Sequence, residues 1–422
     1  MNSTRNAKWN AVLAALISVV PCLPRPVVLL ESGSGRGLIR LAWGQRKRCR
    51  LNWRSEDIGR IGWIENLSPE SRWYGFFSYD LGIPPRAARR EPPIALPLAD
   101  FFEPEHELLL DIESGEVVRG DATILAELDN HAGEVEAEGG SPETSLLQQS
   151  FGQPDFERAV LDIKEYIAAG DVYQVNLSIA QLFETSLTPW QTYLNIRKIN
   201  PSPWMGFADF GDWQLVSGSP ELLVETKVQE SNKFIIRARP IAGTRKKTGD
   251  LARDAEMKSE LTLDEKERAE HRMLVDLARN DLGRVAKYGS LNVSETEVVE
   301  EYSHVFHLVS QVEAVLREEC TAADIVTAVF PGGTITGVPK IRAMEIIAEL
   351  EPVARGAYTG GLGWLGPDGM QLNILIRSAV FRGARVAVQA GAGIVWDSLP
   401  EREWRESNRK AAAMIAALGA YV

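Results

Sequence analysis

Residues 372–389 read LNILIRSAVFRGARVAVQ, and residues 401–418 read EREWRESNRKAAAMIAAL. The first stretch is rich in apolar and β-branched residues, which predicts strands over Leu372–Val380 and Val386–Gln389. The second stretch places charged residues before an alanine-rich run, which predicts a helix from Glu401 to Leu418. Two strands followed by one long helix do not show the regular strand–helix alternation of a doubly wound sheet, so this stretch favours an α+β fold.

The preceding part of the chain follows the same pattern. A helix is predicted where Phe156, Val160, Ile163 and Ile167 recur at helical spacing, and Gly170 follows as a C-terminal cap. Period-two and apolar patterns predict further strands, and a charged amphipathic pattern predicts another helix. The predicted strands are 27–30, 172–183, 215–226 and 234–241, with Ser231 and Asn232 as turn residues, and the predicted helix is 263–278.

The composition of the chain changes at an acidic, glycine-bearing segment. Residues 133–142 read GEVEAEGGSP, which is typical of a linker. We therefore predict three parts: an N-terminal region over residues 1–132, a linker over 133–149 and a catalytic domain over 150–422. No internal repeat is visible.

The net charge limits the classes of partner. The 422 residues carry a formal charge of −12, with 45% hydrophobic and 25% charged residues. A protein that binds nucleic acid or an anionic membrane broadly needs a cationic face, so these classes are disfavoured. An anionic small molecule stays open, because it needs only a local positive pocket.

The cysteines and the N-terminus bear on the compartment. Cys22, Cys49 and Cys320 are odd in number and widely spaced, so a disulfide framework is not expected. The apolar run from Ala11 to Val20 has the length of a signal-peptide core, but Pro21-Cys-Leu-Pro24 follows instead of a small-residue cleavage site. We favour a first structural element over a targeting signal, and expect a cytoplasmic protein.

Carboxylates in two helical segments could hold a cation. Glu403 and Glu406 share one helix face, with Lys410 one turn further on, and Glu270 lies in the other predicted helix. Such oxygen donors suit Mg²⁺. From spacing alone, solvated surface charge explains them equally well.

Two glycine runs and four polar residues in strand-like surroundings complete the candidate features. Gly391-Ala-Gly393 and Gly332-Gly-Thr-Ile-Thr-Gly337 could let backbone amides approach an anion, or could be simple turns. Neither run has P-loop or dinucleotide-binding spacing. The four polar residues are Gln174, Glu221, His307 and Arg377. A buried arginine needs an anionic partner, whereas His307 could equally be a core histidine.

Taken together, residues 150–410 resemble the chorismate-utilising enzyme family, which includes anthranilate synthase component I, aminodeoxychorismate synthase component I, isochorismate synthase and salicylate synthase. Before residue 130 only Leu29-Leu-Glu-Ser32 and Phe77-Ser-Tyr-Asp80 match. The matching segments of the later part are 170–178 (GDVYQVNLS), 218–221 (GSPE), 239–245 (RPIAGTR), 269–271 (AEH), 276–284 (DLARNDLGR), 307–310 (HLVS), 330–345 (FPGGTITGVPKIRAME), 390–395 (AGAGIV) and 403–406 (EWRE).

The resemblance implies a fold and a set of residue roles. The fold is two large antiparallel sheets packed as a sandwich, with helices outside. Glu270 and Glu406 resemble the magnesium ligands, with Glu403 beside them, and Glu221 resembles the general acid for the departing hydroxyl group. His307 corresponds to a histidine that contacts the substrate ring. The implied substrate-binding residues are Gly243, Thr244, Tyr358, Arg377, Gly391, Gly393 and Lys410.

The resemblance also bears on the product. Members that add water use a lysine where this chain has Gln174, and a neutral amide cannot activate water, so ammonia is the expected nucleophile. Motifs such as Tyr173-Gln-Val-Asn176 favour 4-amino-4-deoxychorismate as product. Ala242 favours anthranilate instead, because many aminodeoxychorismate synthases are proposed to use a lysine there. Four residues also resemble the tryptophan site of anthranilate synthases, namely Ser32, Pro203, Trp204 and Met205.

Two further implications concern the partner and catalytic competence. The chain shows no glutaminase pattern, since none of its cysteines lies in nucleophile-like surroundings. The resemblance therefore implies a separate glutamine amidotransferase subunit that supplies ammonia. A non-catalytic chorismate-binding regulator is disfavoured, because Glu221, Glu270 and Glu406 are all present.

Overall fold

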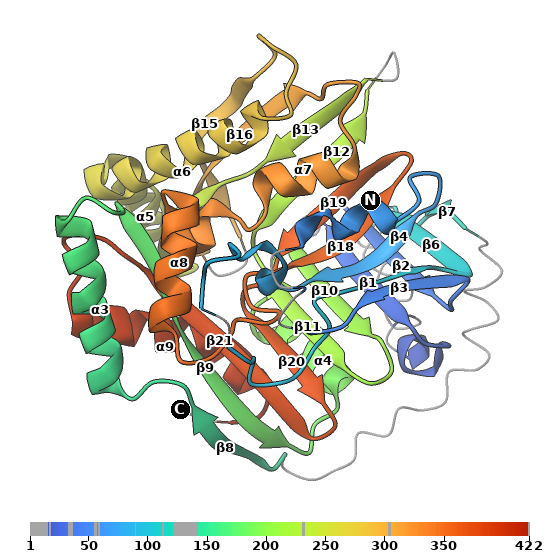
Figure 1. Cartoon of the computed structure of the whole chain (residues 1–422), viewed down its shortest axis with the longest axis horizontal. Helices are drawn as coiled ribbons and strands as arrows, with labels where there is room; N and C mark the ends of the chain where they lie inside the picture. Colours follow the sequence, from blue (N-terminus) through green and yellow to red (C-terminus); the bar gives the residue numbers. More distant parts are fainter. Residues whose placement is uncertain are drawn as a thin grey trace.

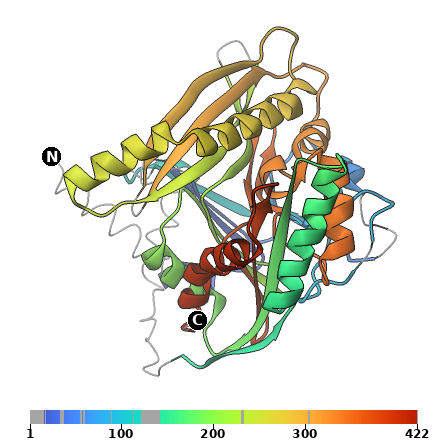
Figure 2. The same ribbon diagram turned by 90° about the vertical axis from the view of Figure 1, so that its left-hand side faces the viewer.

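The computed structural model describes residues 16, 18–32, 37–54, 57, 60–88, 90–111, 114–120, 142–229, 233–302 and 305–420 (Figure 1). Two large antiparallel sheets form its centre, and most of the helices lie outside them (Figures 1 and 2). Within this part of the chain, no helix is both long enough and apolar enough to span a membrane.

The first sheet contains eleven strands and draws on both ends of the chain. Near one end of this sheet, β9 (Gln174–Thr185) and β21 (Arg385–Ile394) pair in register from Arg385↔Glu184 to Ile394↔Val175. The small β8 (Thr144–Gln149) pairs with the outer side of β9. In spatial order the other strands are β17 (Gly337–Val338), β9 (Gln174–Thr185), β21 (Arg385–Ile394), β20 (Ser378–Arg382), β11 (Gln214–Ser219), β10 (Trp204–Asp209), β1 (Val27–Ser32), β2 (Leu38–Trp43), β6 (His106–Asp111) and β7 (Val117–Arg119).

The second sheet contains ten strands and is also antiparallel. The strand β15 (Asn292–Glu301) pairs with β16 beside the main path of the sheet. In spatial order the other strands are β14 (Ile241–Lys246), β16 (Val305–Val315), β13 (Phe234–Ala238), β12 (Leu222–Val228), β19 (Gly369–Ile374), β18 (Gly361–Gly366), β4 (Trp73–Phe77), β5 (Ala99–Glu103) and β3 (Lys47–Leu51).

Local sequence signals start several of the helices. A capping box joins Thr188 and Gln191 at the start of α4, and a second joins Thr321 and Asp324 at the start of α7. The α-helices are α3 (Gln153–Ala168), α4 (Pro189–Ile199), α5 (Leu251–Leu263), α6 (Glu265–Gly283), α7 (Ala322–Val329), α8 (Lys340–Leu350) and α9 (Pro400–Ala417). The short 3-10 helices are η1 (Val20–Cys22), η2 (Ile61–Asn66), η3 (Tyr79–Gly82) and η4 (Gly333–Ile335).

The helices gather at two places on the sandwich. Helix α6, yellow in Figure 1, lies along β14 and β16 of the second sheet. Helices α3, α8 and α9 pack at the β9–β21 end of the first sheet, at the lower left of Figure 1. Helix α6 and the group of α3, α8 and α9 thus cover different sheets.

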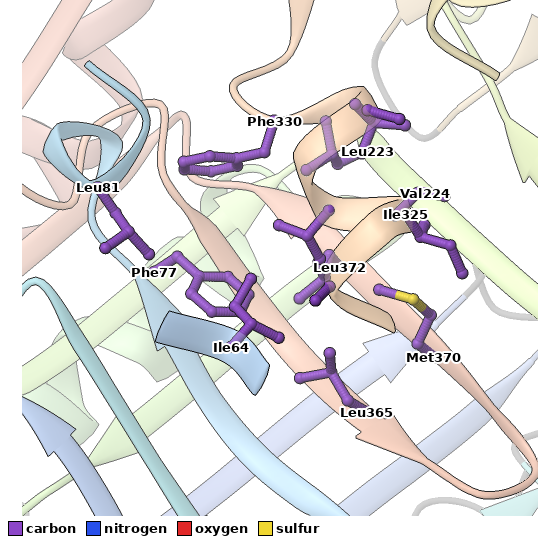
Figure 3. Packing of buried hydrophobic residues seen from close by; sticks show 14 of the residues in the cluster. Ile64, Phe77, Leu81, Leu223, Val224, Ile325, Phe330, Leu365, Met370 and Leu372 are labelled. Carbon is purple, nitrogen blue, oxygen red and sulfur yellow. The ribbon is translucent and has the colours of Figure 1, made fainter. Parts of the chain in front are cut away.

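Apolar side chains from both sheets fill the space between them. Val28 and Leu215 of the first sheet belong to the same buried cluster as Phe76 and Leu362 of the second. Another cluster fills the space between the second sheet and α7, where Phe77, Leu223, Ile325, Phe330 and Leu372 meet (Figure 3). Burial of these clusters from both sides explains why several strands lack a polar face.

The predicted α+β fold with two packed antiparallel sheets is confirmed. Three predicted strands are wrong in extent. The predicted strand 234–241 ends as β13 at Ala238, and Ile241 already belongs to β14. The other two each cross from one sheet to the other. The predicted strand 215–226 is divided into β11 and β12, and the predicted strand 372–380 is divided into β19 and β20. In both cases the chain leaves one sheet and enters the other, because a continuous strand cannot serve two sheets without a bend. The apolar pattern runs through the bend, so it did not reveal the break.

The predicted domain boundaries stay a prediction. Strands from before and after residues 133–149 pair within both sheets, for example β1 with β10 and β4 with β18. Residues 121–141 lie outside the described residues, whereas residues 144–149 form β8. The predicted turn at Ser231 and Asn232 and most of the run from Ala11 to Val20 also lie outside them.

Candidate active site

The two places where the chain changes sheets lie side by side and carry the charged residues singled out from the sequence. Glu221 lies between β11 and β12, and Arg377 lies between β19 and β20. The backbone amides of Ile374 and Gly218 donate to the carbonyls of Glu221 and Arg377, respectively, which ties the two bends together. Arg377 has φ = 51°, a left-handed conformation that costs energy in a residue other than glycine. The bends therefore hold the buried carboxyl group of Glu221 and the partly buried guanidinium group of Arg377 close together.

Glu221 is in an environment that favours its protonated form. The residue is 7% exposed, and burial raises the pKa of its carboxyl group to about 7. Thr334 donates a hydrogen bond of 2.8 Å to Glu221 Oε1, and this bond opposes the shift, as do the positive charges of Lys410 and Arg377. A carboxyl group with this pKa can release a proton near neutral pH, as a general acid must.

His307 is held in one orientation by the β14–β16 pair. Its Nδ1 lies 3.2 Å from the carbonyl oxygen of Gly243 and 3.1 Å from Thr244 Oγ1. Because a carbonyl only accepts, Nδ1 carries the proton in that bond, and Nε2 is left as an acceptor. Burial, with a smaller effect from the charge of Arg377, lowers the pKa of His307 to about 4, although the hydrogen bond to Gly243 opposes the shift. The ring is therefore neutral at physiological pH.

Gly243 allows this arrangement through its backbone. The register of β14 against β16 shifts between Ala242 and Thr244, which marks a bulge at Gly243. Gly243 has φ = 66°, and a Cβ atom there would come 2.7 Å from Leu261 Cδ1. A side chain would therefore be both strained and obstructed, and the bulge turns the Gly243 carbonyl toward His307.

Gln174 lies at the start of β9, against Gly393 of β21. A Cβ atom added at Gly393 would come 2.5 Å from Gln174 Nε2. Gly391, two residues before Gly393 on β21, pairs with Ser178 of β9. A Cβ atom added at Gly391 would collide with the carbonyl oxygen of Leu177. Gly393 thus lets the Gln174 amide approach β21, and Gly391 lets the β9 backbone approach. The glycine run lies within β21 and is not a turn, and binding of an anion by its amides stays a prediction.

The remaining predicted substrate-binding residues are Lys410 and Tyr358. Lys410 of α9 forms an ion pair of 2.8 Å with Glu406, and its charge acts on Glu221. Tyr358 is 8% exposed and packs against the guanidinium group of Arg355, 5.5 Å from the ring centroid. The structure therefore connects Glu221, Arg377, His307 and Lys410 electrostatically, although they come from four separate segments.

The magnesium assignment is neither confirmed nor contradicted. Among the described residues, no three His, Cys, Asp or Glu side chains form a group that could hold a metal. Glu270 lies on α6, whereas Glu403 and Glu406 lie on α9, and all three are partly exposed. Their chemistry fits Mg²⁺, which takes one or two carboxylates and completes its shell with substrate oxygens and water. The assignment stays a prediction.

The four residues predicted for a tryptophan site lie at one end of the β1–β10 pair. Ser32 ends β1, and Trp204 and Met205 begin β10 after Pro203. Ser32 Oγ donates to the carbonyl of Leu38 at 3.0 Å. The neighbouring carboxylate of Glu31 accepts hydrogen bonds from Tyr193 and Arg197. The structure brings these segments together, and binding of tryptophan stays a prediction.

Sequence reasoning did not assign a role to two residues that the geometry makes prominent. Thr334 donates to Glu221, and its place within the run Gly332–Gly337 was the available signal. Arg355 contacts Tyr358, and no spacing pattern distinguishes it from a surface arginine.

The chain is similar in sequence to known proteins that bind chorismate or act in its conversion. Residues 26–416 match the family model described as chorismate binding enzyme. The chain is 50% identical over 279 residues to aminodeoxychorismate synthase component 1 of Bacillus subtilis (strain 168), covering 66% of this chain and 58% of that protein. It is 41% identical over 372 residues to an anthranilate synthase component I-like protein of Synechocystis sp. (strain ATCC 27184 / PCC 6803 / Kazusa), covering 84% of this chain and 74% of that protein. The chain thus matches less than two thirds of the length of the Bacillus relative.

A solved structure extends the similarity to nearly the whole fold. Anthranilate synthase component I from Streptococcus pneumoniae TIGR4 superposes with a TM-score of 0.74 at 32% identity, covering 90% of this chain and 92% of that one. The family match spans both sheets and every residue of the candidate active site. With the two sheets, the buried acid and the basic residues around it in place, the chain belongs to the chorismate-binding enzyme family.

Proposed function

We propose that this chain aminates chorismate with ammonia and that the product is 4-amino-4-deoxychorismate. The observation that carries the proposal is the buried carboxyl group of Glu221, whose pKa is raised to about 7 beside Arg377 and Lys410. An acid that remains protonated near neutral pH suits the protonation of a departing hydroxyl group, and adjacent cations suit the carboxylates of chorismate.

Different residues of the chain have different proposed roles in the reaction. Glu221 donates a proton to the leaving hydroxyl oxygen, and Thr334 orients the carboxyl group for that transfer. Arg377 and Lys410 bind the substrate carboxylates, while neutral His307 presents Nε2 to the ring. Glu270 and Glu406, with Glu403 beside them, would hold Mg²⁺. The ion, when bound, neutralises the charge of a substrate carboxylate.

Gln174 supports ammonia rather than water as the nucleophile. Its side-chain amide packs against Gly393, next to the predicted carboxylate-binding residues. An amide takes no proton near neutral pH, so it cannot generate hydroxide from water. Ammonia already carries a nucleophilic lone pair and needs no such base.

The two candidate products differ in the carbon atom of chorismate that receives the amino group. The 50% identity to an aminodeoxychorismate synthase favours attack at C4. Ala242 favours the alternative, anthranilate, because alanine cannot add covalently to C2 and direct ammonia elsewhere. Ala242 pairs with Leu308 next to the bulge at Gly243, and so lies on the same strand as the candidate site.

The ammonia is proposed to come from a separate glutamine amidotransferase subunit. The cysteines are Cys22, Cys49 and Cys320, and none lies among the residues of the candidate active site. A glutaminase needs a nucleophilic cysteine with a paired base, and the sequence offers none.

The test is to incubate the pure chain with chorismate and Mg²⁺, adding either ammonium or glutamine, and to separate the products by chromatography with mass detection. We expect 4-amino-4-deoxychorismate with ammonium and no amination with glutamine. Anthranilate and pyruvate as the main products would replace the first product by the second. Amination with glutamine alone would refute the need for a partner.

A further inference from the structure

A buried ion pair lies directly behind the candidate active site. Glu351 follows the last residue of α8, and Arg355 is four residues further on. Arg355 Nε lies 3.0 Å from Glu351 Oε2, and Arg355 Nη2 lies 2.8 Å from Glu351 Oε1. The two side chains are 1% and 3% exposed. The pair is therefore two-pronged and removed from water.

Arg355 uses its other donors on backbone atoms of the site. Nη1 donates to the carbonyl of Ile335 at 2.8 Å, and Nη2 donates to the carbonyl of Asn176 at 2.7 Å. Ile335 belongs to η4, next to Thr334, and Asn176 belongs to β9, two residues after Gln174. One guanidinium group thus sets the separation between the segment that holds the acid Glu221 and the segment that carries Gln174.

Glu351 also contacts β9, the strand that carries Asn176. Its Oε1 accepts from the backbone amide of Ser178 at 2.9 Å and from Ser178 Oγ at 2.6 Å. Gln389 of β21 donates to Ser178 Oγ at 2.8 Å, four residues before Gly393. The ion pair therefore fixes β9 against β21 near the Ser178–Gly391 pair, four residues along β9 from Gln174.

The segment that carries Tyr358 is attached to the same arginine. The guanidinium group lies 4.8 Å from the ring centroid of Tyr79 and 5.5 Å from that of Tyr358. Arg355 Nη1 also donates to Thr359 Oγ1 at 3.3 Å. Thr359 has φ = 60°, which is strained for a β-branched residue and persists only where neighbouring contacts enforce it.

The N-terminal region supports this segment from its other side. Ser78 Oγ donates to the carbonyl of Gly356 at 2.8 Å, and the Gly356 amide donates to Asp80 Oδ2 at 2.8 Å. Tyr79 lies between these two residues and covers Arg355. This gives a physical role to the sequence motif Phe77-Ser-Tyr-Asp80.

Burial of two charges is costly, and an ion pair of this kind is weak support for stability by itself. Here the hydrogen bonds of the pair reach three segments of one site, namely η4, β9 and the segment of Thr359, and Arg355 also packs against the ring of Tyr79. We propose that Arg355, held by Glu351, is a positioning residue that sets Tyr358, β9 and η4 in the geometry that binds the substrate carboxylate. Arg355 acts through these segments and does not itself contact the substrate. This inference rests on the proposed function for the identity of the ligand.

The test is Arg355→Lys, which keeps the charge and loses the planar fork that reaches Ile335, Asn176 and Glu351 together. Chorismate KM and, by titration calorimetry, chorismate Kd are measured well below the melting temperature of each variant. We expect both constants to rise about 10- to 100-fold, the effect of misplacing a binding group by about 1 Å. Arg48→Lys is the matched control, because Arg48 forms a two-pronged pair with buried Asp100 between β3 and β5. It should lower the melting temperature and leave KM unchanged.

A double-mutant cycle separates positioning from a purely structural role. If Arg355 acts through Tyr358, the combination of Arg355→Lys with Tyr358→Phe costs less in Kd than the product of the single effects. Additivity within about twofold, or a parental Kd in folded Arg355→Lys, would overturn the inference. Should Arg355→Lys fail to fold, Ser178→Ala removes one contact to Glu351. It should raise Kd by a smaller factor, and a parental value would overturn the inference equally.

Measurements on the parent chain test the proposed function separately from the role of Arg355. A parent that binds chorismate without aminating it refutes the proposed function, and the Kd cycle still tests Arg355. A parent that does not bind chorismate refutes both.

Discussion

Replacement of Glu221 by glutamine should make the protein more stable and less active at alkaline pH. Glu221 is fully buried, and its pKa rises from 4.5 to about 7 because burial disfavours the carboxylate. Glutamine has nearly the same shape and can still accept the hydrogen bond from Thr334. It carries no charge at any pH, so it imitates the protonated acid and cannot donate the proton.

The size and sign of the stability effect follow from the two pKa values. At pH 4 the carboxyl group is protonated in both the folded and the unfolded chain, and parent and variant should be similar. Between pH 4.5 and 7 the unfolded chain releases its proton while the folded chain retains it, so parental stability falls as the pH rises. The total loss is about 3 kcal/mol at pH 8.5, since each pKa unit corresponds to about 1.4 kcal/mol. The variant avoids this loss, and its melting temperature should exceed the parental value by about 3 °C.

The assay is a melting curve at pH 4.5, 7 and 8.5, together with kcat/KM for chorismate at pH 7 and 8.5. The variant should lose about 10²- to 10⁴-fold in kcat/KM, the usual contribution of a general acid. Parental kcat/KM should fall above pH 7, as the acid loses its proton. Glu225→Gln, on β12 four residues after Glu221 and paired with Lys227, is the control and should retain activity. Parallel melting profiles of parent and variant would refute the raised pKa, and parental activity in the variant would refute the role of acid.

Three further predictions concern other residues. Glu270→Gln and Glu406→Gln should each abolish turnover and leave the circular dichroism spectrum unchanged; activity within a few-fold of the parent at saturating Mg²⁺ would contradict the metal role. His307→Asn should lower kcat/KM by the same factor from pH 5.5 to 7.5, because the histidine pKa of about 4 keeps its ring neutral there; a factor that changes near pH 6.5 would show a titrating ring. Ala242→Lys should raise the yield of 4-amino-4-deoxychorismate, measured by mass detection, since a tethered amine can occupy C2; loss of all amination would contradict this.

The sequence predicts the elements better than their connection. Period-two and period-3.6 patterns identified β9, α3, α6 and α9, because each element buries one face along its length. The same patterns ran through Glu221 and Arg377 without a break, because both flanking strands are apolar. The change of sheet at these residues depends on packing between distant segments, which periodicity does not record.

The site was predictable where a residue type is unusual in its surroundings, and not where its role depends on three-dimensional contacts. An acid and an arginine within apolar strands stood out. Gly393 was noted as part of a glycine run, and Gly243 followed only from the family resemblance. No sequence pattern distinguishes Arg355 or Glu351 from other charged residues. Their significance appears only when Asn176, Ile335 and Tyr358 are brought to the same guanidinium group.

The most direct test of the central claim is a labelling experiment with the pure chain. Chorismate and Mg²⁺ are supplied with ¹⁵N-ammonium in H₂¹⁸O, and the products are identified by mass spectrometry. With Gln174 unable to activate water and Glu221 able to expel the hydroxyl group, we expect ¹⁵N-labelled 4-amino-4-deoxychorismate and no ¹⁸O-labelled isochorismate. An ¹⁸O-labelled isochorismate as the main product, or chorismate recovered unchanged, would contradict the claim that this chain aminates chorismate.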